Sequence, residues 1–397
     1  MAYVPLISYI LYSTAGPIIP LQSLVSYSFL GICCLFSFYA MMHIKATSFI
    51  KTIYFFLLIE FVYFLFTDKI IIAADGWPIE NWGYMKGIIW TFVPFFFTYY
   101  LTSTGNLTSK HMLVFCAIYL PFLIAFFFWN KVEMINKAAE NGRIVTDITN
   151  NSGYEFMHLL ILLPLMASKR FLSVAYIALL SFFIVLSAKK GCMIIAVMIF
   201  LFYLPSWLRE KRNRKVGFII VIVLAILVAV AVRYFSEYEY LVERLELMSE
   251  GYTSHRDEIA EDIWDYCFHK HFSFQTLLFG YGFNYSWCMA GQSAHNDWLE
   301  LLASHGLFGI ITYLVFFFQM FKEFRKVNDP ELKKMAFIVL MIWFTSTFFS
   351  QGYGQSDLVA LFMGFVFGRN AYETAPMIKC RKQTNNIELK PQAFYAQ

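Results

Sequence analysis

A cluster of polar side chains near residue 295 stands out in a chain that is otherwise mostly apolar. His295, Asn296 and Asp297 are consecutive, and Glu300 follows within "SAHNDWLELLASHGLFG". Histidine titrates near neutral pH, and the start of a helix disfavours its charged form, so a neutral His295 would be able to accept a proton from a hydroxyl group. The alternative, a histidine that only caps the helix or lies at a membrane interface, stays open. We therefore take His295 as a candidate general base, with Asn296 and Glu300 as supporting residues.

Cationic side chains at two other places suit an anionic substrate. Lys189 and Lys190 lie between two apolar runs, and Arg256 falls in the first turn of a predicted helix, where a cation opposes the helix dipole. The ordinary alternatives are that the two lysines reach toward lipid phosphates and that Arg256 is a solvated surface residue. Arg244 lies in the same loop as Arg256 and is a further supporting cation.

The composition indicates that these residues belong to a membrane protein. Of 397 residues, 59% are hydrophobic and 15% are charged, against about 25% charged in a typical soluble domain. Apolar runs long enough to cross a bilayer recur along the chain. The formal net charge of +4 does not suggest nucleic acid as a partner. We expect an all-α, polytopic transmembrane helix bundle.

About 11 to 12 spans are predicted from apolar length, the first being the least certain. They are Val4–Pro20, Leu21–Met42, Ile53–Ala73, Gly87–Ser103, Met112–Asn130, Phe156–Ala167, Phe171–Ala188, Gly191–Trp207, Val216–Tyr234, Leu307–Phe321, Met335–Phe349 and Leu358–Ala371. Together they make one integral-membrane domain over residues 1–372, followed by a cytoplasmic tail over residues 373–397.

The charges of the connecting loops predict the orientation. Basic clusters such as "REKRNRK" and "KEFRK" recur at every second loop, and the positive-inside rule places those loops in the cytoplasm. The opposite loops are acidic or neutral, the two largest being residues 131–155 and residues 235–297. The second begins with a helix-start pattern at Ser254–Asp257, after which Ile259 and Ile263 recur at helical spacing, so we expect an amphipathic helix there.

Two glycine patterns accompany the His295 segment. Gly280 and Gly282 in "LFGYGF" allow a tight turn or a close approach of two backbones, and an ordinary turn is the simpler reading. Gly306 and Gly309 allow the chain to bend or pack closely where it enters the bilayer.

The order of these motifs resembles the O-antigen ligases and the Wzy-type O-antigen and capsule repeat-unit polymerases. The chain reads "SAKKG", then "SHRDEI", then "FGYGF", then "AHNDWLELLASHGLFGI". The order of spans agrees over most of the chain, and the specific motif covers Gly280–Gly309. The resemblance implies a GT-C-like membrane glycosyltransferase in the bacterial inner membrane, with its site on the periplasmic face and a large helical extracytoplasmic loop.

The resemblance also implies roles for the candidate residues. The donor would be an oligosaccharide on undecaprenyl pyrophosphate, His295 would activate the acceptor hydroxyl, and Arg256 would hold the pyrophosphate. Lys189 and Lys190 stand where the family has an arginine, which removes the two-pronged fork of a guanidinium and puts their pyrophosphate role in doubt. A chain-length regulator and a flippase would be partners.

Three functions compete. A repeat-unit polymerase is favoured because the chain departs from the ligase-like arginine, an O-antigen ligase acting on lipid A-core is the alternative, and a polysaccharide-related transporter is third. The clearest acid within a span is Glu60, whereas the charges that need explanation lie at the outer rim. We expect no metal cofactor. Asp297 and Glu300 have cation-binding oxygens, but acidic pairs at this spacing are ordinary on helix surfaces.

Overall fold

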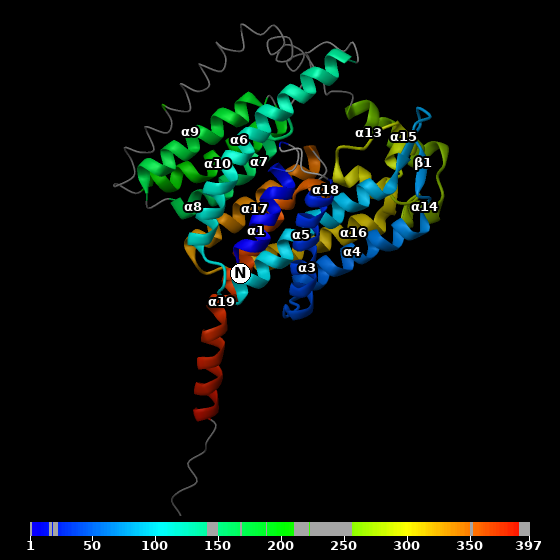
Figure 1. The fold of residues 1–397 in the computed structure, drawn as a ribbon. Helices are drawn as coiled ribbons and strands as arrows, with labels where there is room; N and C mark the ends of the chain where they lie inside the picture. The colour runs from blue at the N-terminus through cyan, green and yellow to red at the C-terminus, as the bar shows by residue number, and fades with distance from the viewer. Residues whose placement is uncertain are drawn as a thin grey trace, which may run out of the picture.

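The fold is a bundle of helices in the computed structural model (Figure 1). The structure describes residues 2–15, 18, 23–140, 150–166, 169–187, 189–209, 222, 256–349 and 352–388. The predicted all-α class is confirmed, and the strands described are two three-residue segments. The predicted span Val216–Tyr234 and residues 235–255 of the large loop lie outside the description.

The N-terminal helices follow most of the predicted spans. They are α1 (Tyr3–Ile10), the π-helical η1 (Leu11–Ala15), α3 (Ser23–His43), α4 (Ser48–Phe66), α5 (Asn81–Ser103) and α6 (Ser109–Glu140). The helix α6 continues through residues 131–140, which we expected to begin an outer loop. That segment, "KVEMINKAAE", consists largely of good helix formers, so the helix outlasts the apolar run.

The predicted span Ile53–Ala73 is wrong at both ends. The helix starts at Ser48 because the Thr47 hydroxyl accepts a hydrogen bond from the Ile50 N–H at 3.3 Å. It stops at Phe66, and the apolar run beyond it forms β1 (Ile70–Ile72), which pairs antiparallel with β2 (Pro78–Glu80). Gly76, at φ 89°, closes the turn between these strands. Apolar length alone therefore misassigned a short hairpin as the end of a span.

The middle and C-terminal helices complete the bundle. They are α7 (Gly153–Leu159), the 3-10 helix η3 (Leu160–Leu162), α8 (Leu163–Met166), α9 (Arg170–Leu186), α10 (Lys190–Arg209), α16 (Asp297–Lys326), α17 (Pro330–Phe349), α18 (Gly352–Gln355) and α19 (Asp357–Glu388). The large loop is helical as well, with α13 (Arg256–Asp265), the π-helical η4 (Tyr266–Lys270), α14 (Phe274–Phe279) and α15 (Ser286–Ala290).

Four of the described helices are long and apolar enough to cross a membrane. They are Leu24–His43, Ser48–Phe66, Ser109–Val132 and Asp297–Lys326, and shorter apolar helices occupy Gly153–Met166, Phe171–Leu186 and Gly191–Tyr203. The polytopic character is thus confirmed, while the total of 11 to 12 spans stays a prediction.

The two helices α5 and α19 form the most extensive packing in the bundle. Gly364 and Gly368 of α19 lie against the backbone of α5, where a Cβ would collide with Thr98 or Tyr99. The Thr98 hydroxyl donates a hydrogen bond across this contact to the Leu361 carbonyl at 3.0 Å. Small residues and a hydroxyl at a helix contact are the usual means by which helices associate in lipid.

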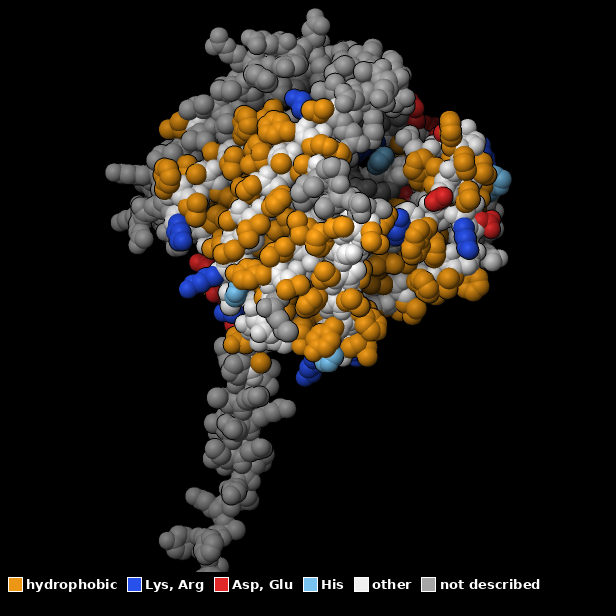
Figure 2. Space-filling model, in the orientation of Figure 1, with side chains coloured by type: hydrophobic (Ala, Val, Ile, Leu, Met, Phe, Trp, Pro, Cys, Tyr) orange, Lys and Arg blue, Asp and Glu red, His pale blue; other side chains and the backbone are white. Residues whose placement is uncertain are grey.

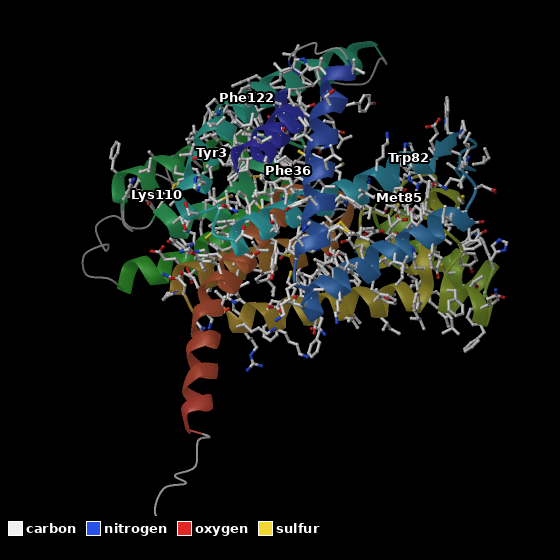
Figure 3. The ribbon with its side chains drawn as sticks, turned by 60° about the horizontal axis from the view of Figure 1, so that its bottom comes forward. Tyr3, Phe36, Trp82, Met85, Lys110 and Phe122 are labelled. Carbon is white, nitrogen blue, oxygen red and sulfur yellow. The ribbon has the colours of Figure 1, made fainter. Side chains whose placement is uncertain are left out.

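The helices of the large loop lie together at one end of the bundle. In Figure 1, α13, α14 and α15 occupy the right-hand side, and the last turns of α19 project from the opposite end. Figure 3 shows the same separation: Trp82, at the start of α5, lies toward the loop helices, and Lys110, at the start of α6, lies toward the other end. The candidate site residues of the loop are therefore far from the last turns of α19.

Candidate functional site

The large loop folds onto the end of the bundle as a small domain-like cap. Ile259 and Ile263 of α13 are buried, and with Cys267, Met289, Ala294 and Ala303 they form a separate apolar cluster. The predicted amphipathic helix is therefore confirmed. Its first residue is Arg256, so the guanidinium stands at the end of the helix that faces the rest of the site.

His295 occupies an unusual backbone conformation just before α16. Its φ is 49°, in the left-handed region that few residues other than glycine adopt. The Asn296 side chain caps the helix, because its Oδ1 accepts from the N–H groups of Trp298 and Leu299 at 2.9 and 3.2 Å. The imidazole itself is exposed, so it is accessible to a substrate.

Two cations act on His295. Partial desolvation lowers the pKa of His295, and the positive charges of Arg256 and Lys189 lower it further. Each of these causes favours the neutral imidazole, the form that accepts a proton. The structure thus brings three of the predicted residues together from α13, the segment before α10, and the segment before α16. The side chain of Lys190 and all of Arg244 lie outside the described residues.

The charges near His295 predict the pH dependence of activity. A general base at His295 would work as the neutral imidazole. The rate should then fall as pH drops through the lowered pKa of His295, so we expect the acid limb of the pH profile to lie below about 6.5. In Lys189→Gln one of the cations is lost, and the limb should move to higher pH. The profile of kcat/KM measures this, and an unmoved limb would mean that Lys189 does not act on the base.

Glu300, a residue of α16, forms hydrogen bonds with the large loop. The residue is fully buried, its Oε2 accepts from the Ser286 hydroxyl at 2.6 Å and from the Ala294 N–H at 3.4 Å, and its Oε1 accepts from the Ser304 hydroxyl at 3.1 Å. The N–H of Ala294 belongs to the residue before His295. Glu300 therefore supports the backbone that carries the imidazole.

Asp297 and Glu300 are both buried, unlike the acidic pairs that are ordinary on helix surfaces. Asp297 accepts a hydrogen bond from the Tyr313 hydroxyl at 2.7 Å. The Asp297 and Glu300 carboxylates therefore accept hydrogen bonds from different residues. In the part of the chain that the structure describes, no group of three or more His, Cys, Asp or Glu side chains is arranged to hold a metal.

We expect Glu300→Gln to reduce the rate by lowering kcat more than it raises KM. The amide keeps the shape but loses the charge that strengthens three hydrogen bonds, so the loop around His295 loosens. An effect of about 10-fold to 100-fold is reasonable for one buried charged acceptor. Steady-state kinetics with a lipid-linked donor separates the two constants, and a change in KM alone would show that Glu300 acts in substrate binding instead.

Gly280 and Gly306 form the joint between the loop and α16. Gly306 breaks the helix, with φ 62° and ψ −154°. The N–H groups of Tyr281 and Gly282 then donate to the carbonyls of Ala303 and Ser304 at 2.9 and 3.1 Å. A Cβ on either glycine would collide with the backbone around the other. The close backbone approach, rather than an ordinary turn, explains "FGYGF", and the predicted bend at Gly306 is confirmed.

A second histidine, for which we predicted no role, lies beside this joint. His305 and Glu60 are buried with their Nε2 and Oε2 atoms 3.4 Å apart, and the ring of Tyr63 lies 4.2 Å from the imidazole. Neither the imidazole nor the carboxylate makes a hydrogen bond with any described residue. Glu60 stood out in the sequence as an acid within a span, but its partner lies about 245 residues away in the chain and could not be identified.

The surface is hollowed near these residues. Figure 2 shows a recess in the region where Figure 1 labels α13 and α18, with a histidine side chain inside it and Lys or Arg side chains nearby. An exposed imidazole with two cations acting on it can activate a hydroxyl and stabilise the negative charge of a leaving group.

Comparison with known proteins matches this part of the chain to one family. Residues 175–314 match a family described as O-antigen ligase. The matched region includes Lys189, Arg256, His295 and the whole Gly280–Gly309 motif, so the resemblance found in the sequence is confirmed there. No curated protein and no solved structure matches the chain.

Proposed function

Because residues 175–314 carry the O-antigen ligase domain, we propose that this protein is a membrane glycosyltransferase that polymerises polysaccharide repeat units. The donor is a glycan on undecaprenyl pyrophosphate, and the acceptor is a sugar hydroxyl of another lipid-linked unit. The reaction takes place at the periplasmic face of the bacterial inner membrane. The observation that carries the proposal is an exposed His295 whose pKa is lowered by partial desolvation and by the positive charges of Arg256 and Lys189.

The proposed reaction uses each of these groups once. His295 takes the proton from the attacking acceptor hydroxyl, whose oxygen forms a bond to the anomeric carbon of the donor sugar. The bond between that carbon and the pyrophosphate oxygen breaks, and undecaprenyl pyrophosphate leaves with the bonding electrons. Arg256 and Lys189 stabilise the charge that grows on the diphosphate. The leaving group supplies the driving force, so no nucleotide is required.

An O-antigen ligase is the second candidate, favoured by the description of the matching family. Deletion of the gene separates the two. A surface polysaccharide reduced to a single repeat supports the polymerase, and long glycan that accumulates on its carrier supports the ligase. Unchanged polysaccharide would overturn both, and loss of all periplasmic lipid-linked glycan would support a transporter.

We expect the reaction to be independent of metal ions. Arg256 and Lys189 supply the positive charge that a divalent cation supplies in other transferases, so chelation with EDTA should leave the rate of glycan transfer unchanged. The measurement uses purified protein in lipid nanodiscs, with added Mg²⁺ as the matched comparison. A rate that EDTA abolishes and Mg²⁺ restores would contradict this prediction.

A further inference from the structure

A second polar cluster is formed where α1, α5, α6, α7 and α19 meet. We call Tyr9, Trp90, Tyr119, Glu155 and Asp357 the acid–aromatic cluster. Tyr9 Oη and Trp90 Nε1 both donate to Asp357 Oδ2, at 2.8 and 3.0 Å. Tyr119 Oη donates to Glu155 Oε2 at 3.4 Å, and the two carboxylates are within electrostatic reach of each other.

A buried nitrogen beside the acid–aromatic cluster lacks a hydrogen-bond partner among the described residues. His158 is 2% exposed, and its Nδ1 lies 3.8 Å from Glu155 Oε2, beyond hydrogen-bond distance. This nitrogen makes no hydrogen bond with any described residue. Buried polar atoms are nearly always paired, so an unpaired one beside a weakly bonded carboxylate points to a group that binds there.

The edge of the acid–aromatic cluster is accessible. The Glu155 side chain is 23% exposed, and Asp357 and Trp90 are also only partly buried. Tyr12 lies against Trp90 with its ring edge-on, at 4.6 Å between centroids. The accessible part of the cluster is therefore the Glu155 carboxylate, together with the portions of Asp357 and of the Trp90 ring that Tyr9 and Tyr12 leave uncovered.

These groups suit the ring of a neutral sugar. Aromatic faces pack against the C–H surface of a pyranose, and carboxylates accept strong hydrogen bonds from its hydroxyl groups. The partly exposed Glu155 carboxylate does not favour an anionic sugar. The chemistry selects a hydroxyl-rich ring that is neutral or N-acylated.

The acid–aromatic cluster is linked to the His295 site through the turn that precedes α10. Lys189 acts electrostatically on His295, and both Lys189 and Glu155 act on Cys192. The segment before α7 is joined to the same turn, because the Asn150 N–H donates to the Ser187 carbonyl at 3.1 Å. Lys189 thus acts on His295 and, at Cys192, shares a neighbour with Glu155.

We propose that the acid–aromatic cluster binds the acceptor sugar and presents its hydroxyl to His295. The proposal rests on the proposed function for the direction of transfer. Glu155 and Asp357 hold hydroxyl groups of the acceptor ring, Trp90 supports its face, and the pyrophosphate of the donor stays with Arg256 and Lys189.

Binding to the full-length protein in nanodiscs tests this proposal. The probes are undecaprenyl pyrophosphate and the oligosaccharide that mild acid releases from the lipid-linked fraction of the host. Glu155→Gln and Asp357→Asn should raise the Kd for the oligosaccharide about tenfold or more, the usual effect of losing a charged hydrogen bond. Their Kd for undecaprenyl pyrophosphate should not change, which also establishes that the variants are folded.

Two further variants complete the comparison. Trp90→Phe keeps the packing and should weaken oligosaccharide binding by a smaller factor, and it replaces the acid variants if they fail to fold. Asp265→Asn, at an exposed acid paired with Lys270, is the control and should bind both probes normally.

The outcomes separate this proposal from the proposed function. Oligosaccharide binding that is equal in wild type, Glu155→Gln, Asp357→Asn and Trp90→Phe overturns the acceptor subsite even if glycan transfer is intact. Equal loss of both probes also overturns it, because the cluster would then serve the fold. If the variants lose the oligosaccharide selectively but deletion of the gene leaves surface polysaccharide unchanged, the sugar site stands and the polymerase function falls.

Discussion

Replacing His295 by alanine should stop glycan transfer without preventing insertion or folding. The imidazole is exposed and contributes little to the core, whereas loss of a general base lowers kcat by about 10²- to 10⁴-fold. In cells, long polysaccharide should give way to a single repeat on the lipid carrier. Gel analysis of surface polysaccharide and turnover by the purified enzyme measure the two effects.

Two variants make this prediction specific. His295→Asn removes the imidazole but keeps the backbone conformation, because asparagine tolerates the left-handed φ of this position better than alanine does. This variant should be as inactive as His295→Ala. His269→Ala is the matched control, since His269 is exposed in the same loop and pairs with Asp265. Normal polysaccharide ladders in His295→Ala would remove this residue from the mechanism.

Replacing Arg256 by alanine should weaken use of the donor far more than use of the acceptor. The guanidinium lies in the first turn of α13, and its charge acts on His295. Loss of a charged contact to the diphosphate should raise the Kd for undecaprenyl pyrophosphate about 10-fold to 100-fold. Binding of the released oligosaccharide should stay close to that of the wild type.

The arginine fork makes a graded comparison possible. Arg256→Lys keeps the charge but not the paired N–H groups, so it should fall between wild type and Arg256→Ala. Lys270→Ala serves as control because Lys270 is exposed in the same loop. Equal loss of donor and acceptor binding in Arg256→Ala would argue against a pyrophosphate contact.

Much of the fold follows from the sequence because bilayer thickness sets the length of an apolar helix. That reasoning failed where a local signal ended the helix before the apolar run did. Ile70–Ile72 are as apolar as a span, yet a turn at Gly76 returns the chain and pairs them with Pro78–Glu80. It also failed at residues 131–140, where polar helix formers extend α6.

The site was predictable where its residues are close in sequence. His295, Asn296 and the Gly280–Gly306 joint lie within one segment, and the start of α13 carries its own helix signal. The pairings of Glu60 with His305 and of Asp357 with Tyr9 join residues from opposite parts of the chain. Hydropathy and motif spacing contain no information about such pairs. The burial of Glu300 was missed for the same reason, since its partner Ser286 lies on another helix.

The joint between "FGYGF" and α16 has a consequence for engineering this enzyme. Its two hydrogen bonds run from main-chain N–H groups to main-chain carbonyls. Glycine at positions 280 and 306 allows the two backbone segments to approach this closely. Because these hydrogen bonds join main-chain atoms only, they do not depend on which side chains the neighbouring residues carry. A cap transplanted from a relative with different sugar preference should therefore dock correctly provided that both glycines travel with it. Chimeras that lose either glycine should misassemble, because a Cβ at position 280 or 306 would collide with the facing backbone.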